Sequence, residues 1–124
     1  MVNAIGFKTS QNLGGLMENT VAVELFMRKA RSPLMEIYYW KNYQQREVDF
    51  VINEGPIVRS LIQVTYALQK NDIRKSEVDI LVCAGKELRC ADFRIITWDY
   101  EDEQRIGNRS IKFTPLWKWL IEVE

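Results

Sequence analysis

The alternation of hydrophobic and polar positions predicts three consecutive strands in the first half of the chain. Positions 35–41 and 47–53 are rich in aromatic and β-branched residues, and a short polar loop separates them. Glu54-Gly55-Pro56 is a turn signal, after which positions 57–66 predict a third strand. Strands with such short connections pair antiparallel, so we expect this segment to form a meander.

Helical periodicity flanks the meander on both sides. Positions 16–30 have apolar residues at helical spacing after Gly14-Gly15, and Pro33 is expected to end this helix. Residues 1–13 have weak periodicity and are expected to be a partly ordered lead-in. Positions 71–86 predict a second helix, in which Ile73, Ile80, Leu81 and Ala84 lie near one face.

The last third of the chain predicts one more central strand and a closing motif. Positions 93–98 are apolar enough for the middle of a sheet, and positions 106–113 predict a hairpin around Gly107-Asn108. Thr114-Pro115 predicts an N-cap and first turn of a final helix. The expected order is therefore α-β-β-β-α-β, followed by a hairpin and a helix.

The composition excludes several classes of site but does not indicate one particular activity. The 124 residues fit one domain, 1–124, and carry 17 basic and 17 acidic side chains, so net charge does not indicate a polyanion partner. The absence of histidine removes His general bases and His-ligated zinc. Cys83 and Cys90 match no zinc motif; reduced thiols are favoured over a disulfide. No membrane span or signal peptide is apparent, so a cytoplasmic protein is expected.

Two acidic positions sit where a core-forming element would place apolar residues. Glu18 falls within the apolar stripe of the first helix, where an unpaired carboxylate is costly. Period-two alternation places Glu47, Asp49 and Val51 on one face of the second strand, opposite Val48, Phe50 and Ile52. Alternatives stay open: Glu18 near the helix start is favoured by the helix dipole, and the Asp49 face is simply wet in a half-exposed sheet.

The third strand offers a reason to bring these groups together. If the turn at Gly55-Pro56 pairs residues of equal parity, Asp49 comes near Leu61 and Gln63. Glu18, Asp49 and Gln63 then converge where the helix packs on the sheet. Oxygen ligands of this kind suit Mg²⁺ or Mn²⁺, so the pattern predicts a hard-cation site.

These segments resemble the PD-(D/E)XK nuclease superfamily, which has the restriction-endonuclease-like fold: a central mixed β-sheet flanked by helices, with an α-β-β-β-α-β core. Among its branches, the chain is similar to the C-terminal nuclease-like domain of archaeal AAA+-type ATPases. The segments that carry the likeness are Leu16-Met17-Glu18-Asn19, Ile37-Tyr38-Tyr39-Trp40-Lys41, Glu47-Val48-Asp49-Phe50-Val51, Leu61-Ile62-Gln63-Val64, Ile95-Ile96-Thr97-Trp98-Asp99 and Pro115-Leu116-Trp117-Lys118-Trp119-Leu120. No Gly-Lys-Ser/Thr phosphate loop is present, so this chain is not the ATPase part.

The resemblance implies a Mg²⁺- or Mn²⁺-dependent deoxyribonuclease, expected to be an endonuclease. Asp49 matches the metal-binding aspartate, Gln63 the Glu/Gln ligand, the Val64 carbonyl the remaining ligand, and Glu18 the helix glutamate. The family's lysine should follow two residues after Gln63, and Thr65 stands there instead. Lys41 on the neighbouring strand is the candidate replacement.

The candidate substrate contacts are Arg28, Lys29, Arg46 and Thr65, and the expected partner is DNA. The departure at Thr65 keeps a second hypothesis open: a catalytically inactive nucleic-acid-binding or ATPase-partnering module. A third class is a structural dimerisation domain. Leu16, Val23 and Met27 form a second apolar side of the first helix, which predicts a homodimer.

Overall fold

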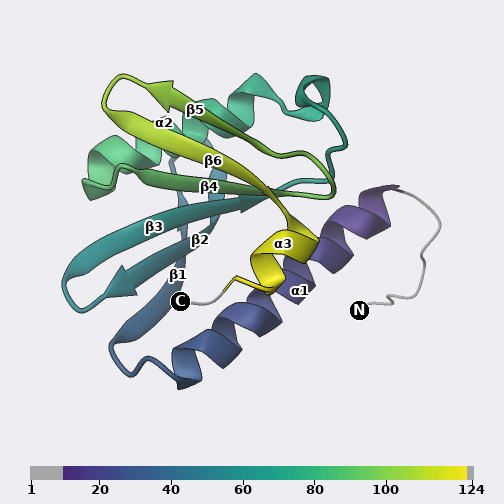
Figure 1. Ribbon diagram of the computed structural model, residues 1–124. Helices are drawn as coiled ribbons and strands as arrows, with labels where there is room; N and C mark the ends of the chain where they lie inside the picture. Colours follow the sequence, from purple (N-terminus) through teal and green to yellow (C-terminus); the bar gives the residue numbers. More distant parts are fainter. Residues whose placement is uncertain (1–9, 123–124) are drawn as a thin grey trace.

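The computed structural model describes residues 10–122, with side chains from residue 13 onward. One six-stranded mixed sheet has the order β1-β2-β3-β4-β6-β5 and is flanked by helices (Figure 1). The strands are β1 (Met35–Lys41), β2 (Glu47–Glu54), β3 (Ile57–Val64), β4 (Asp92–Thr97), β5 (Asp102–Ile106) and β6 (Arg109–Pro115). The helices are α1 (Ser10–Ala30), α2 (Lys75–Leu88) and α3 (Leu116–Leu120), with a 3₁₀ turn at Lys70–Asp72.

The strand connections confirm the predicted meander and hairpin. β1, β2 and β3 pair antiparallel in sequence, and β5 pairs antiparallel with β6 across Gly107-Asn108. Helix α2 provides the crossover that lets β4 run parallel to β3, and β6 in turn runs parallel to β4. The carboxyl ends of β3, β4 and β6 therefore meet at one edge of the sheet, which is where ligands bind in many open sheets.

The sheet separates two hydrophobic cores. One core, on the α2 side, contains Leu81, Phe93 and Phe113. The other lies under α1 and α3, where Met17, Val21 and Leu25 pack against the sheet and against Trp119. Figure 1 shows α3 beside α1, so the first and last described helices share one face of the sheet.

Three predicted helix starts are wrong. Helix α1 begins at Ser10 and runs through Gly14-Gly15, because two glycines weaken a helix by only about 1 kcal/mol each and packing offsets this cost. The lead-in prediction therefore fails for residues 10–13, and residues 1–9 lie outside the described part. Helix α2 begins at Lys75, after the 3₁₀ turn. In α3, Pro115 is the N-cap rather than the first helical residue, because β6 continues to that position.

Two further predictions concern the cysteines and the membrane. Cys83 is exposed, Cys90 is buried, and both are free thiols, so the disulfide alternative is wrong. No helix in residues 10–122 combines the length and apolar character needed to cross a membrane.

Candidate functional site

A β-bulge in β2 sets the direction of Asp49. Tyr38 pairs with Val51 and Trp40 with Val48, so Asp49 and Phe50 together oppose Tyr39 alone. Bulges of this kind place two consecutive side chains on the same side of the sheet and often re-aim a functional residue.

The bulge overturns the predicted faces of β2. Val48 and Val51 both pack in the core on the α2 side, whereas Phe50 and Ile52 pack in the core under α1. Asp49 does not share a face with Val51, because the extra residue shifts the alternation by one position. Asp49 instead lies on the α1 side, where it contacts Glu18. Glu18 itself is exposed, so the prediction that it lies within the buried stripe of the helix is wrong.

The side chain of Gln63 joins β2 to β3 where their backbone pairing ends. Gln63 lies opposite Asp49, one position beyond the last paired residues, and it is only 5% exposed. Its Nε2 donates to the carbonyl oxygen of Glu47 at 3.1 Å, and its Oε1 accepts from the backbone N–H of Asp49 at 2.9 Å. Both ends of this buried amide are satisfied by backbone groups, as burial requires.

The Asp49 carboxylate also joins β2 to β3 beyond the end of their backbone pairing. Its Oδ2 accepts a hydrogen bond from the backbone N–H of Val64 at 2.9 Å. The N–H and C=O of one strand residue point to the same edge, so the Val64 carbonyl also faces Asp49. The carboxylate is thereby fixed beside the carbonyl that the metal hypothesis requires.

Asp49 and Glu18 form a pair of like charges. The pKa of Asp49 is raised to about 7, first by burial, while the Val64 hydrogen bond lowers it and the charge and side-chain hydrogen bond of Glu18 raise it further. Glu47 adds a smaller increase in this pKa, so both charged groups that act on Asp49 are themselves acidic. Near pH 7, Asp49 is therefore protonated in part of the molecules, and a cation bound beside Glu18 would replace that proton.

The model of the family described as "Domain of unknown function (DUF4143)" matches residues 13–116, which is most of the chain. The chain belongs to the DUF4143 family. This DUF4143 domain is of a kind associated with C-terminal domains linked to AAA ATPases. No curated protein and no solved structure matched the chain.

The donor set of the DUF4143 domain is smaller than the sequence predicts. Within residues 13–122, no group of three acidic or cysteine side chains is placed to hold a metal ion. Glu18 and Asp49 come together, but Gln63 follows Leu61 on the α2 side by alternation, and its oxygen already accepts from β2. The predicted convergence of three oxygen donors is therefore wrong for Gln63, because its amide is bonded to the β2 backbone from the other side of the sheet.

The remaining candidate residues lie elsewhere. Arg28 is buried in the α1–α3 interface, and Lys29 forms an ion pair with Glu36 at 3.7 Å. Arg46 lies in the β1–β2 turn, where its Nη2 donates to the Ser76 carbonyl. Lys41 is exposed at the end of β1.

Thr65 and Glu77 form a contact that sequence reasoning missed. A hydrogen bond from Thr65 lowers the pKa of Glu77, but burial outweighs it and raises that pKa overall. Oε1 of Glu77 is buried without a hydrogen-bond partner among the described residues. The available signal was helical spacing, because Glu77 is four residues from both Ile73 and Leu81 on the predicted apolar face.

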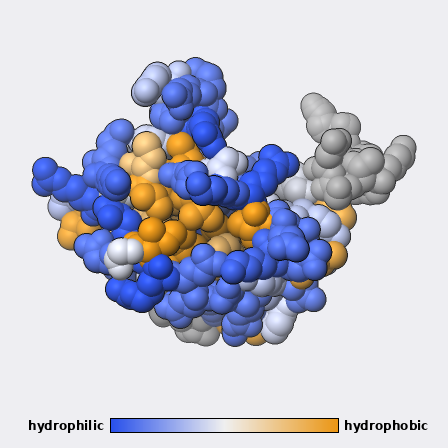
Figure 2. All heavy atoms as spheres, turned by 90° about the horizontal axis from the view of Figure 1, so that it is seen from above, coloured by the Kyte–Doolittle hydropathy of each residue, from blue (hydrophilic) through white to orange (hydrophobic). Residues whose placement is uncertain are grey.

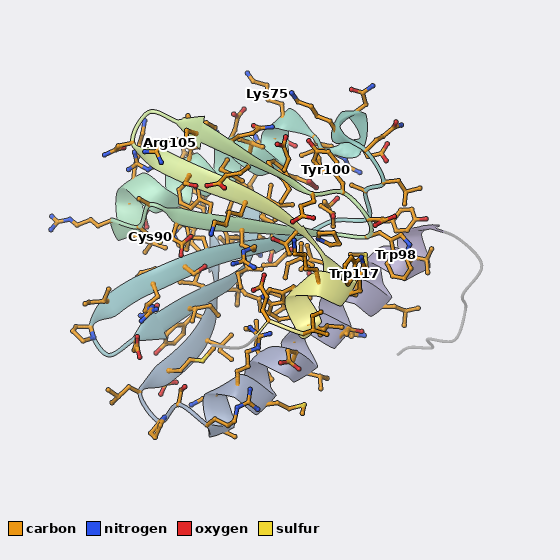
Figure 3. The ribbon with its side chains drawn as sticks, in the orientation of Figure 1. Lys75, Cys90, Trp98, Tyr100, Arg105 and Trp117 are labelled. Carbon is orange, nitrogen blue, oxygen red and sulfur yellow. The ribbon has the colours of Figure 1, made fainter. Side chains whose placement is uncertain are left out.

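Exposed aromatic rings stand at the carboxyl edge of the parallel strands. Trp98 follows β4 and is 43% exposed, and Trp117 follows β6 and is 57% exposed (Figure 3). Tyr66 follows β3, with its ring centroid 6.1 Å from that of Trp98. Trp119, in contrast, is buried beneath α1. The Val64 end of β3 thus has rings beside it that are available for stacking.

Proposed function

We propose that this DUF4143 domain is a Mg²⁺- or Mn²⁺-dependent endonuclease of the restriction-endonuclease-like fold that hydrolyses DNA. The observation that carries the proposal is the Glu18–Asp49 pair, two carboxyl groups brought together beside the backbone of Val64. The strand order and the α2 crossover agree with the core expected for that fold. Within residues 13–122, the charged groups that act on Asp49 are both acidic, which is a feature of sites that receive a cation.

The oxygen donors present fit a hard cation. Asp49 and Glu18 would hold it together with the Val64 carbonyl. When bound, such an ion lowers the pKa of a water molecule and neutralises charge on the scissile phosphate. The Val64 N–H orients the Asp49 carboxylate, and the Gln63 amide fixes the backbone that carries it. Trp98 and Trp117 would stack on nucleobases.

A second candidate is a non-catalytic module that binds an ATPase partner. Thr65 occupies the position at which PD-(D/E)XK nucleases have a lysine. No contact among the described residues joins the candidate replacement, Lys41, to Asp49. The outer side of α1 is apolar and exposed, with Val23 at 59%, Phe26 at 60% and Met27 at 54%. Such a stripe on a helix is typical of a protein-binding surface.

The nuclease proposal is tested by incubating supercoiled plasmid with the purified domain and Mg²⁺ or Mn²⁺. We expect metal-dependent nicking that is lost in Asp49→Asn and in Glu18→Gln, since either change removes a carboxylate without altering side-chain size. Glu36→Gln on β1 is the matched control and should retain activity. Cleavage that persists in Asp49→Asn would contradict the assignment, and absence of cleavage in the wild type would favour the binding module.

A further inference from the structure

Strand β5 ends the sheet with a free edge whose outward groups belong to Glu103 and Arg105. Ser110 pairs with Arg105, but the Ser110 N–H donates away from β5, to the carbonyl of Ala91 at 3.3 Å. Ser110 and Arg105 are therefore a pair that shares no backbone hydrogen bonds. It follows that the N–H and C=O of Arg105, and of Glu103 two residues earlier, point away from β6.

The two charged residues of this edge, Glu103 and Arg105, would meet opposite charges on an antiparallel second copy of β5. If two copies of β5 pair antiparallel about Gln104, each Glu103 lies opposite Arg105 of the other copy. These are the residues with outward backbone groups, so this register allows four backbone hydrogen bonds and two cross-strand ion pairs. Two of those hydrogen bonds use the Glu103 N–H, which donates to Asp102 Oδ1 at 2.8 Å in the single copy and would exchange that acceptor for the partner strand. Both side chains are exposed, and Figure 3 shows Arg105 on the β5–β6 hairpin at the outside of the molecule. Charged edge strands normally prevent pairing, but this charge order opposes pairing with other edges and favours a second β5.

An apolar hollow lies on the α2 side of the same edge. Val78, Val82 and Cys83 of α2 line it together with Ile106 at the end of β5, and Asp79, Lys86 and Glu87 complete its border. Figure 2 looks down on this part of the molecule and shows hydrophobic side chains in a hollow with hydrophilic ones around it. A two-fold axis through Gln104, perpendicular to the sheet, keeps both copies of α2 on one side. The two hollows would then face each other across the seam.

We infer that this domain forms a homodimer through antiparallel pairing of β5 with β5, which makes one continuous sheet of two copies. This surface differs from the apolar side of α1, which stays available for another partner. The inference does not rest on nuclease activity, because neither Asp49 nor Glu18 lies on β5.

Charge reversal tests the pairing directly, with sedimentation velocity at low salt as the readout. Glu103→Arg and Arg105→Glu each create two like-charge pairs, so each variant should raise the dimer dissociation constant about tenfold or more. Mixing the two variants places opposite charges together again and should give a heterodimer. The double variant E103R/R105E restores both pairs and should dimerise within about threefold of the wild type. Glu36→Arg on β1, the opposite edge strand, is the control and should dimerise like the wild type.

Two results would overturn the inference. One is a wild-type domain that remains monomeric at about 1 mM protein. The other is a dimer that persists in both single reversals and is lost in Phe26→Asp, which would assign the contact to α1. Circular dichroism of each variant separates loss of association from loss of folding.

Discussion

The two halves of helix α1 place charged side chains in different environments. Near its C-terminus, Arg28 is 6% exposed, and its Nε donates to Glu24 at 2.8 Å. Its Nη2 donates to the Trp119 carbonyl at 2.8 Å, and its guanidinium lies 4.3 Å from the centroid of the Trp119 ring. In the N-terminal half of α1, Glu18 is exposed but contacts the partly buried Asp49 of β2, and the pKa of Asp49 is raised to about 7.

The partners of the two charged groups differ: those of Arg28 indicate a structural role, and those of Asp49 indicate a candidate site. Arg28 receives an opposite charge, a carbonyl and an aromatic face from its own chain, so it stabilises the α1–α3 contact without any external group. Asp49 receives one backbone N–H and two carboxylates, so its charge is balanced only when a proton or a cation joins the pair. A like-charge pair held by the fold indicates function more strongly than a buried ion pair does.

The largest expected effect comes from removing the structural charge. Arg28→Met leaves Glu24 without its partner and the Trp119 carbonyl without a donor, so we expect a loss of about 3 kcal/mol in the free energy of unfolding. Urea denaturation monitored by tryptophan fluorescence measures it. A loss below about 0.5 kcal/mol would show that the α1 C-terminal end does not depend on this cation.

A smaller loss is expected at the strand junction. Gln63→Leu leaves the Asp49 N–H and the Glu47 carbonyl without hydrogen-bond partners, so stability should fall by about 2 kcal/mol. Gln63→Glu loses only the donor to Glu47 but brings a third carboxylate near Asp49. Its melting temperature should therefore be lower without metal and rise more steeply with Mn²⁺ than that of the wild type. Equal Mn²⁺ responses in the two proteins would place the metal elsewhere.

The raised pKa of Asp49 also predicts how the stability of the domain depends on pH. Because the folded-state pKa of Asp49 is above its unfolded value, the folded protein binds the proton more tightly. This contribution is fully present below about pH 4 and is lost as pH rises toward about 7. Asp49→Asn should therefore be more stable than the wild type at pH 8, and the advantage should shrink toward pH 4. Urea titrations across this range measure the difference, and parallel pH profiles would contradict the raised pKa.

The smallest effect is expected for an exposed pair of the same helix end. Lys29 and Glu36 are 3.7 Å apart, and their side chains are 34% and 52% exposed. Lys29→Met should change the free energy of unfolding by less than about 0.5 kcal/mol, since water screens such pairs. A loss as large as that of Arg28→Met would show that exposure does not separate the two cations.

The sequence predicts the elements better than it predicts the site. Strand alternation and the Gly107-Asn108 turn are local features, and the meander and hairpin follow from them. The bulge at Asp49 and Phe50 is not visible in the sequence, because the four residues from Glu47 to Phe50 fit period-two alternation, and an apolar Val51 also fits a strand that is covered on both faces. Register with β1 decides it, and that register depends on contacts far apart in the chain.

In the candidate site too, the residue types are visible in the sequence, but the contacts between residues far apart in the chain are not. That Glu18 and Asp49 meet follows from packing α1 on the sheet. The sequence marks both as acidic positions among apolar ones, but it places Glu18 within the buried stripe of the helix, whereas Glu18 is exposed. That Gln63 uses its amide to join β2 and β3 is not apparent, since a side chain's partners depend on where the ladder ends. The Arg28 contact with Trp119 spans 91 positions, which is why a basic cluster in sequence predicted a surface residue.

Calorimetric titration of the domain with Mn²⁺ at pH 7, in two buffers of different ionisation enthalpy, tests the central claim most directly. If a cation replaces the proton on Asp49, Mn²⁺ binding releases protons, and both binding and release are lost in Asp49→Asn. Binding that is absent in the wild type, or unchanged in Asp49→Asn, would contradict the account.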